Sequence, residues 1–196
     1  MNNIDEKDIK QRYGINLHHT LTVEDVLDGA ELSFKNGVLD RAELSDSVHI
    51  GSHIKSCYIS AINLISSDLS ESKIERSFVE GSRLSGLDIG ESVLQDVVFE
   101  NCRMNGVSFR KARLRRVLYS ECNLAEATFQ SAELEQVVFR SCNLSGVDFS
   151  NSKFKEIDIR GSRLNGARFG MEQLRGLTID QTQATYIALL TGVKID

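Results

Sequence analysis

The chain has 196 residues, of which 41% are hydrophobic and 26% charged, a length and balance that suit one domain or one solenoid. It lacks the roughly 18 consecutive apolar residues of a membrane span, and its charged start, MNNIDEKDIK, has no apolar signal-peptide core, so we expect a cytoplasmic protein. The net charge of −5 is unevenly spread. Residues 21–100 carry 15 acids and 6 bases, a net of −9, whereas residues 101–196 carry 10 acids and 14 bases, a net of +4.

The first segment, residues 1–33, shows no internal repeat. Thr22 and Asp25 have a spacing that favours the start of a short helix through Leu27. We interpret the segment as an N-terminal cap, because the open end of a solenoid needs a cover.

The second segment, residues 34–179, repeats with a period of five. Every fifth residue is apolar or Tyr, and of these 30 positions only His49 departs from the pattern. A second candidate for the interior lies two residues before each of them and is mostly small, as Ala42 and Ser82 illustrate. Side chains two residues apart on an extended chain point the same way, so each pentad turns two side chains inward.

A period of 20 is superimposed on the period of five. One column is Leu44, Leu64, Leu84, Met104, Leu124, Leu144 and Leu164; another is Phe109, Phe129, Phe149 and Phe169; a third is Cys102, Cys122 and Cys142. Four pentads therefore make one coil, and at about 4.8 Å per coil the rod is roughly 36 Å long before its caps. Inward serines must bond the backbone, and Gly86, Gly106, Gly146 and Gly166, which fall at one corner, suit positive φ.

Three stretches, CNLAEATF (122–129), CNLSGVDF (142–149) and SRLNGARF (162–169), resemble the A-(D/N)-L-x-x pattern of the pentapeptide-repeat family. The resemblance covers about three quarters of the chain. It implies an all-β solenoid, namely a right-handed quadrilateral pentapeptide-repeat β-helix with a short C-terminal capping helix.

The third segment, residues 180–196, predicts that helix. Asp180 and Gln183 have the spacing of an N-cap with its capping box, and Gly192 ends the helix. The stretch LRGLTIDQTQATYIALLTGVKI resembles the C-terminal end of Qnr-type quinolone-resistance proteins, which implies a homodimer joined tail to tail by this helix. The expected dimer contacts are Ala184, Tyr186, Ile187, Leu190 and Val193. The alternative is a monomer in which the helix only seals the core.

An apolar ridge is predicted on one outer face. Its members are outward residues spaced 20 apart, namely Val38, Tyr58, Phe78, Val98, Leu118 and Val138. An exposed apolar strip marks a partner interface. The alternative is an ordinary ladder face, where β-branched and aromatic residues are favoured and charged side-chain stems cover them.

Charged residues give two further candidates. An acidic patch is predicted where Asp68 stacks on Asp88 and Glu71 on Glu91, and it either binds a basic partner or is a solvated face. A basic cluster consists of Arg103, Arg110, Lys111, Arg113, Arg115 and Arg116. Such a cluster suits phosphates, but no aromatic residues alternate with it and the chain is acidic, so direct nucleic-acid binding is not expected.

The sequence shows no set of residues that would form a catalytic, cofactor or metal site. His49 takes an inward position, His53 points outward, and His18 and His19 fall in the N-terminal cap. We expect the cysteines of the column to pack in the core as small apolar side chains, and not to act as metal ligands or a redox pair. We therefore expect neither an enzyme nor a cofactor.

Two hypotheses of function follow. By its family resemblance, the chain binds DNA gyrase or topoisomerase IV as a mimic of duplex DNA and modulates sensitivity to quinolones or toxins. The alternative is a structural or assembly scaffold whose apolar ridge docks another protein.

Overall fold

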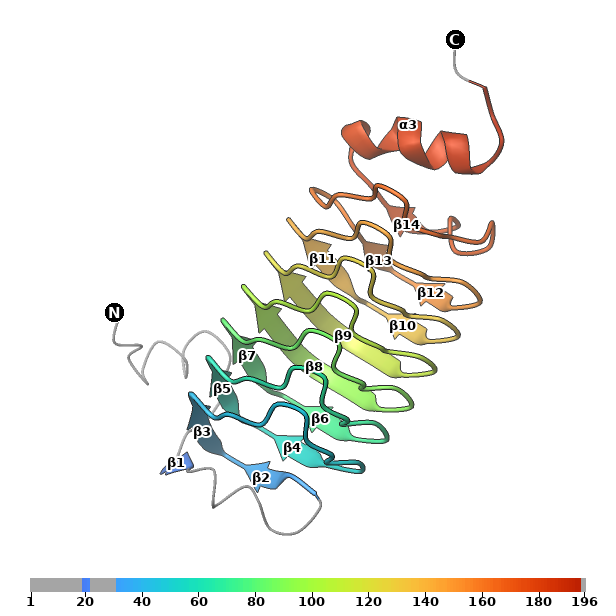
Figure 1. Ribbon diagram of the computed structural model, residues 1–196. Coiled ribbons are helices and arrows are strands. Elements are labelled where there is room, and N and C mark those ends of the chain that lie inside the picture. The colour runs from blue at the N-terminus through green and yellow to red at the C-terminus, as the bar shows by residue number, and fades with distance from the viewer. Residues whose placement is uncertain (1–18, 22–30, 195–196) are drawn as a thin grey trace.

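The computed structural model describes residues 19–21 and 31–194, and these form a parallel β-solenoid that ends in one helix (Figure 1). Neighbouring coils pair in a register of 20 residues, so that Phe34 pairs with Ile54 and Ile54 with Ile74. The right-handed quadrilateral β-helix that the family resemblance implied is confirmed. Residues 1–18 and 22–30, which hold most of the predicted N-terminal cap and its short helix, lie outside the described residues.

Two faces of the rod carry its regular strands. The basic face is built from β2 (Ser33–Lys35), β4 (His53–Lys55), β6 (Lys73–Glu75), the first halves of β8 (Val93–Glu100) and β9 (Arg113–Ser120), β10 (Glu133–Glu135) and β12 (Lys153–Lys155). The ridge face is built from β1 (His19–Leu21), β3 (Gly37–Asp40), β5 (Tyr58–Ser60), β7 (Phe78–Glu80), the second halves of β8 and β9, β11 (Val138–Arg140), β13 (Ile157–Asp158) and β14 (Leu177–Thr178). The strands of each face lie side by side along the rod, and strands such as β4, β6 and β10 have the two-residue alternation that buries the central side chain.

On the other two faces, isolated β-bridges between single residues join neighbouring coils. The asparagine face stacks Glu43, Asn63, Arg83, Arg103, Asn123, Asn143 and Arg163. The aspartate face stacks Val48, Asp68, Asp88, Ser108, Thr128, Asp148 and Arg168. From β2 and β3 onward, all four faces therefore keep the 20-residue register, and their outward columns run along the rod. β1 departs from it, because His19 pairs with Gly37 at an offset of 18 residues.

The corners between faces use left-handed backbone. Gly86 and Gly106 have φ of 67° and 68°, as expected, but twenty described residues other than Gly also have positive φ, among them Arg41 and Glu121. This conformation costs an L-residue about 1 kcal/mol or more. The ladder offsets the cost, because most corner N–H groups bond a carbonyl of the next coil, as Arg41 N does to the Ser60 carbonyl at 3.0 Å.

The inward columns form one continuous core that changes character along the rod. In the N-terminal coils it is aliphatic, with members such as Leu69 and Ile74, and it leaves a void of about 30 Å³. In the C-terminal coils two aromatic columns stack. Ring centroids of Phe109 and Phe129 are 4.7 Å apart, and the Tyr119 ring stands edge-on to Phe129 at 6.3 Å.

The second inward position is occupied mainly by serine in the N-terminal coils. The Ser67 hydroxyl donates to the Leu44 carbonyl at 2.7 Å, so inward serines bond the backbone as predicted. In later coils cysteine makes the same link over 23 residues, as Cys122 does to the Phe99 carbonyl at 3.4 Å. All four cysteines are free and buried, and burial raises the pKa of the Cys57 thiol. These thiols are structural donors in a dry core.

The helix α3 (Gln181–Leu190) covers the last coil. The Asp180 carboxylate accepts hydrogen bonds from the N–H groups of Thr182 and Gln183, and the Gln183 side chain accepts one from Asp180 N, so the predicted capping box is confirmed. The Gln183 amide also donates to the carbonyls of Ile159 (2.7 Å) and Ser162 (2.8 Å). A polar side chain thus bonds carbonyls in the last coils of the ladder. Among the described residues, no helix is both long enough and apolar enough to cross a membrane.

Candidate functional site

Over the described residues, the interior of the rod is filled with packed, mostly apolar side chains. The described residues contain no group of three or more His, Cys, Asp or Glu side chains placed to hold a metal ion. His49 is buried in the core, and neither of its ring nitrogens has a hydrogen-bond partner among the residues described. His53 is exposed on the basic face, His19 belongs to β1, and His18 lies outside the described residues. The outer faces are therefore the candidate functional surfaces.

The apolar ridge is less exposed than the sequence predicted. Its six residues do share one column of the ridge face, but Tyr58 and Phe78 are each only 2% exposed. Their rings stack with centroids 5.6 Å apart, and Val38 and Val98 pack against them. The prediction of an exposed strip is wrong for these two aromatic residues. The ridge is half-exposed at Val38, Val98, Leu118 and Val138.

A polar contact fixes the aromatic pair of the ridge. The Tyr58 hydroxyl donates a hydrogen bond to Glu80 Oε2 at 2.6 Å. Burial and the nearby Glu80 carboxylate both raise the pKa of Tyr58, because each disfavours the phenolate. The hydroxyl therefore remains a donor.

Most carboxylates of the predicted acidic patch have structural partners. Asp68 and Asp88 pair across neighbouring coils. Asp68 accepts from Ser70 N and Asp88 from Gly90 N, each at 2.8 Å, so both shape their own turns. Glu91 is bonded by Lys111 Nζ at 2.8 Å, which lowers the pKa of Glu91. Glu71, at a corner, is exposed to solvent.

The basic cluster is contiguous in sequence but not in space. Arg103 lies on the asparagine face, Arg110 follows Phe109 on the aspartate face, and Arg113 and Arg115 lie on the basic face. Lys111 and Arg116 occupy the corners beside it. Consecutive residues wind around the rod, so a run of charge is divided among faces.

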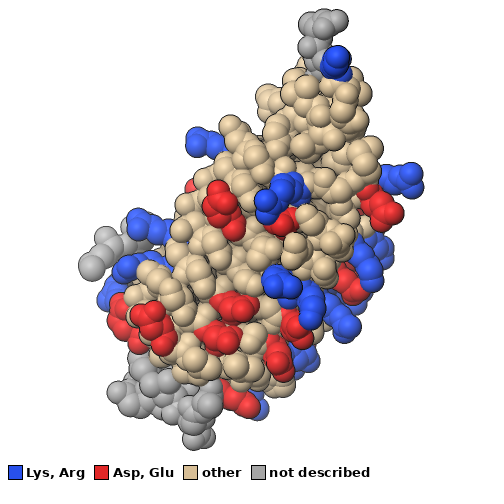
Figure 2. Space-filling model, turned by 45° about the vertical axis from the view of Figure 1, so that its right-hand side comes forward, with Lys and Arg blue, Asp and Glu red and all other residues tan. Residues whose placement is uncertain are grey.

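The basic face gathers cations from positions 20 residues apart. Its two outward rows hold seven Lys or Arg residues and three Glu residues, namely Lys35, Lys55, Lys73, Arg113, Arg115, Lys153 and Lys155 with Glu75, Glu133 and Glu135. Each Glu lies between two bases, so the face is positive although the chain is acidic. In Figure 2, basic side chains are numerous along the right-hand side and acidic ones gather over the lower coils.

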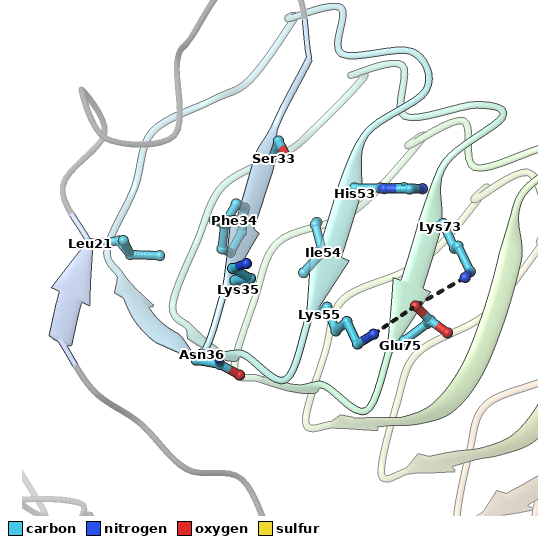
Figure 3. Close-up of a pocket in the computed structure, with 10 residues that line it drawn as sticks. All are labelled: Leu21, Ser33, Phe34, Lys35, Asn36, His53, Ile54, Lys55, Lys73 and Glu75. Atoms are coloured by element: carbon cyan, nitrogen blue, oxygen red, sulfur yellow. Dashed lines mark ion pairs between the residues drawn. The ribbon is translucent and has the colours of Figure 1, made fainter.

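Two hollows lie along the basic face. The N-terminal one measures about 600 Å³, and Figure 3 shows Lys55 and Lys73 directed at Glu75 beside Phe34 and Ile54. The C-terminal one measures about 400 Å³ and lies over β9, β10 and β12. Both hollows are lined by charged residues together with apolar ones. The sequence indicated this surface only through charges at a 20-residue spacing.

The C-terminal end of the rod presents apolar side chains. Of the predicted dimer residues, Tyr186 and Ile187 pack on the rod's own core, and the Tyr186 hydroxyl donates to the Ala167 carbonyl at 2.9 Å. Ala184 is exposed, Leu190 is half-buried, and Val193 is 54% exposed. Met171 and Leu189, which the sequence did not single out, are 62% and 53% exposed. The outward-facing apolar set is thus Met171, Leu189 and Val193.

Comparison with protein families finds one match, in which the model of the pentapeptide repeat region covers residues 92–169. No curated protein sequence matches the chain significantly. Solved structures that resemble it include full-length QnrB1, a plasmid-mediated fluoroquinolone resistance protein. The two sequences are 17% identical, the match covers 82% of this chain and 90% of that chain, and the TM-score is 0.40.

Two further solved structures are pentapeptide-repeat proteins. One, from the Arabidopsis thaliana thylakoid lumen, has 26% identity over 67% of this chain and 76% of its own, with a TM-score of 0.38. The other is HetL, involved in heterocyst differentiation regulation in the cyanobacterium Nostoc sp., with 13% identity, coverage of 91% and 95%, and a TM-score of 0.29.

Proposed function

We propose that this chain, whose residues 92–169 match the pentapeptide repeat region, is a non-enzymatic rod that binds other proteins through its outer faces. The observation that carries the proposal is the filled interior. Apart from half-buried Ser47 and Phe154, the inward columns are buried from Leu32 to Ala167. The void between them is about 30 Å³, room for little more than one water molecule. Substrate-sized ligands need several hundred Å³, so recognition falls to the outward columns.

We propose DNA gyrase or topoisomerase IV as the partner, with the acidic N-terminal coils standing in for duplex DNA. The resemblance of the C-terminal stretch to Qnr-type proteins supports this choice, as does the net charge of −9 over residues 21–100. A row of carboxylates on a rigid rod attracts a protein groove built for phosphates. Bound in this way, the rod would modulate quinolone or toxin sensitivity.

The test is a supercoiling and quinolone-cleavage assay with purified gyrase and rising concentrations of the rod. Wild type is expected to inhibit supercoiling or relieve quinolone-induced cleavage. Glu71→Lys, at an exposed corner of the acidic coils, should weaken the effect, and Glu126→Lys, at an exposed corner of the later coils, should not. A wild-type rod without effect at micromolar concentration would exclude this partner.

The second candidate function is a scaffold that docks another protein on the ridge face. Half-exposed Leu118 and Val138, adjacent on β9 and β11, favour it. Replacing both by Ser should abolish capture of the partner, whereas Asn123→Ser with Asn143→Ser, at the same spacing on the asparagine face, should not. Equal capture by both double variants would count against the ridge.

We also propose that two rods join tail to tail at their C-terminal ends. The exposed apolar side chains of Met171, Leu189 and Val193 support this arrangement, since apolar area beyond the needs of one cap tends to find a partner. Leu189→Asp should give a monomer in sedimentation equilibrium. Val48→Asp, at a residue 61% exposed near the opposite end, should leave the mass unchanged. A wild-type monomer would refute the dimer.

A further inference from the structure

Two matched rows of charge line the C-terminal hollow of the basic face. One row is Arg113, Glu133 and Lys153, and the other is Arg115, Glu135 and Lys155. Both rows come from β9, β10 and β12, so each strand contributes one residue to each row. Between the rows lie Leu114, Leu134 and Phe154, which line the hollow of about 400 Å³ although their side chains turn toward the core. The hollow is thus a short groove with two charged walls, which we call the arginine groove.

Within each wall the glutamate holds its lysine more closely than its arginine. Lys153 Nζ is 2.8 Å from Glu133, whereas Arg113 Nε is 3.7 Å from it. The other wall repeats the pattern, with Lys155 at 2.5 Å from Glu135 and Arg115 at 3.5 Å. The lysines lower the pKa of both glutamates, which therefore stay ionised and paired. Each wall keeps one surplus positive charge, and its loosely held member is the arginine.

The two arginines are placed to act together. Arg113 and Arg115 lie two residues apart on β9, on either side of inward Leu114, so their side chains leave the strand on the same side about 7 Å apart. Their side chains are 73% and 56% exposed. A guanidinium presents a planar fork of donors that matches a carboxylate. A carboxylate between the walls can therefore receive donors from both sides.

We propose that the arginine groove binds an extended acidic segment of a protein partner and that Arg113 and Arg115 together clamp one of its carboxylates. The alternating signs along each wall favour a protein over a nucleic acid. A phosphate backbone carries one sign of charge and would meet Glu133 and Glu135 one coil beyond the clamp. A peptide can place a basic or neutral residue there.

This site is independent of the proposed topoisomerase partner. That proposal uses negative charge in residues 21–100, whereas the arginine groove uses positive charge on three later strands. A rod that fails in the supercoiling assay can still bind an acidic segment.

The test measures fluorescence anisotropy of a labelled peptide of alternating Glu and Val with the full-length chain. Wild type should bind it and should not bind the matched Gln–Val peptide. Arg113→Gln with Arg115→Gln should weaken binding by about tenfold or more. The matched control is Arg83→Gln with Arg103→Gln, which removes two stacked arginines from the asparagine face and should change affinity by less than about twofold. Circular dichroism confirms that each variant is folded.

A charge-preserving variant separates the clamp from the general field of the rod. Arg113→Lys with Arg115→Lys keeps both charges but loses the planar forks, so it should also weaken binding. Three results would overturn the proposal: no binding of the Glu–Val peptide by wild type, equal losses in the two glutamine variants, or tighter binding of a single-stranded thymidine oligonucleotide that depends on the same two arginines.

Discussion

The N-terminal and C-terminal coils share one backbone register but fill it differently. The earlier coils combine aliphatic columns, serine hydroxyls bonded to the backbone and a small void. The later coils combine stacked aromatic rings with cysteine, alanine and valine. The net charge differs between the same two regions: it is negative over residues 21–100 and positive over residues 101–196. The register is thus a property of the ladder, whereas packing density and charge are set coil by coil.

The largest expected effect is a charge in the aromatic half. Leu124→Asp places a carboxylate in a fully buried column between Met104 and Leu144, where it meets only apolar side chains. We expect loss of the cooperative thermal transition, because an unpaired buried charge costs several kcal/mol. Circular dichroism measures it. The adjacent exposed change Asn123→Asp should melt like wild type, and a Leu124→Asp protein that did so too would contradict the packed core.

The two halves can be compared in one column. Phe129→Ala removes a ring that contacts four others and should lower the free energy of unfolding by about 4 kcal/mol. Leu69→Ala, in the same column but beside the void, should cost about 2 kcal/mol, because its neighbours are less densely packed. Urea unfolding measures both. An equal or larger loss for Leu69→Ala would mean that the halves are packed alike.

A smaller effect of opposite sign is expected at the centre of the aromatic half. The Tyr119 hydroxyl is fully buried and has no hydrogen-bond partner within the described part of the chain. Tyr119→Phe should raise the free energy of unfolding by about 1 kcal/mol, because it removes an unsatisfied polar group. Tyr186→Phe is the matched control, since that hydroxyl donates to Ala167 and its loss should destabilise. A destabilised Tyr119→Phe would show that the hydroxyl has a partner.

The smallest expected effect is the pH response of the paired aspartate in the later coils. Burial tends to raise the pKa of Asp148, but hydrogen bonds from Ser150 and Arg168 outweigh it and hold the pKa below its ordinary value. A lowered pKa gives stability that is present above about pH 4 and is lost as the pH falls through the folded-state pKa. Asp148→Asn should therefore lose less stability than wild type between about pH 6 and about pH 3 in urea titrations. Equal losses would contradict the pairing.

The sequence predicted the fold well because the repeat is strict. Inward columns, coil length and the capping box at Asp180 and Gln183 all depend on local spacing, and the structure confirms them. His49, the exception in the repeat, is buried like its column neighbours, because register rather than residue type decides which side chains turn inward.

The surfaces were harder to predict because neighbours on a face are distant in sequence. The run from Arg103 to Arg116 seemed to be one basic cluster, yet the corners divide it among faces, and Arg113 instead belongs with Glu133 and Lys153. Likewise, the period of 20 places Tyr58 and Phe78 on the outside but does not reveal that they are buried there. Outward exposure depends on what packs against a face, which a repeat does not encode.

The 20-residue register that holds from β3 to β14 also makes the length of the rod adjustable. If residues 122–141 were deleted, Glu121 would precede Cys142, whose place in the coil is that of Cys122, and each remaining column would close over the gap. Insertion or loss of whole coils therefore changes the distance between the two ends in steps of about 4.8 Å while the identity of each face is kept. In evolution or design, the number of coils in such a rod can therefore set the distance between the partners bound at its two ends.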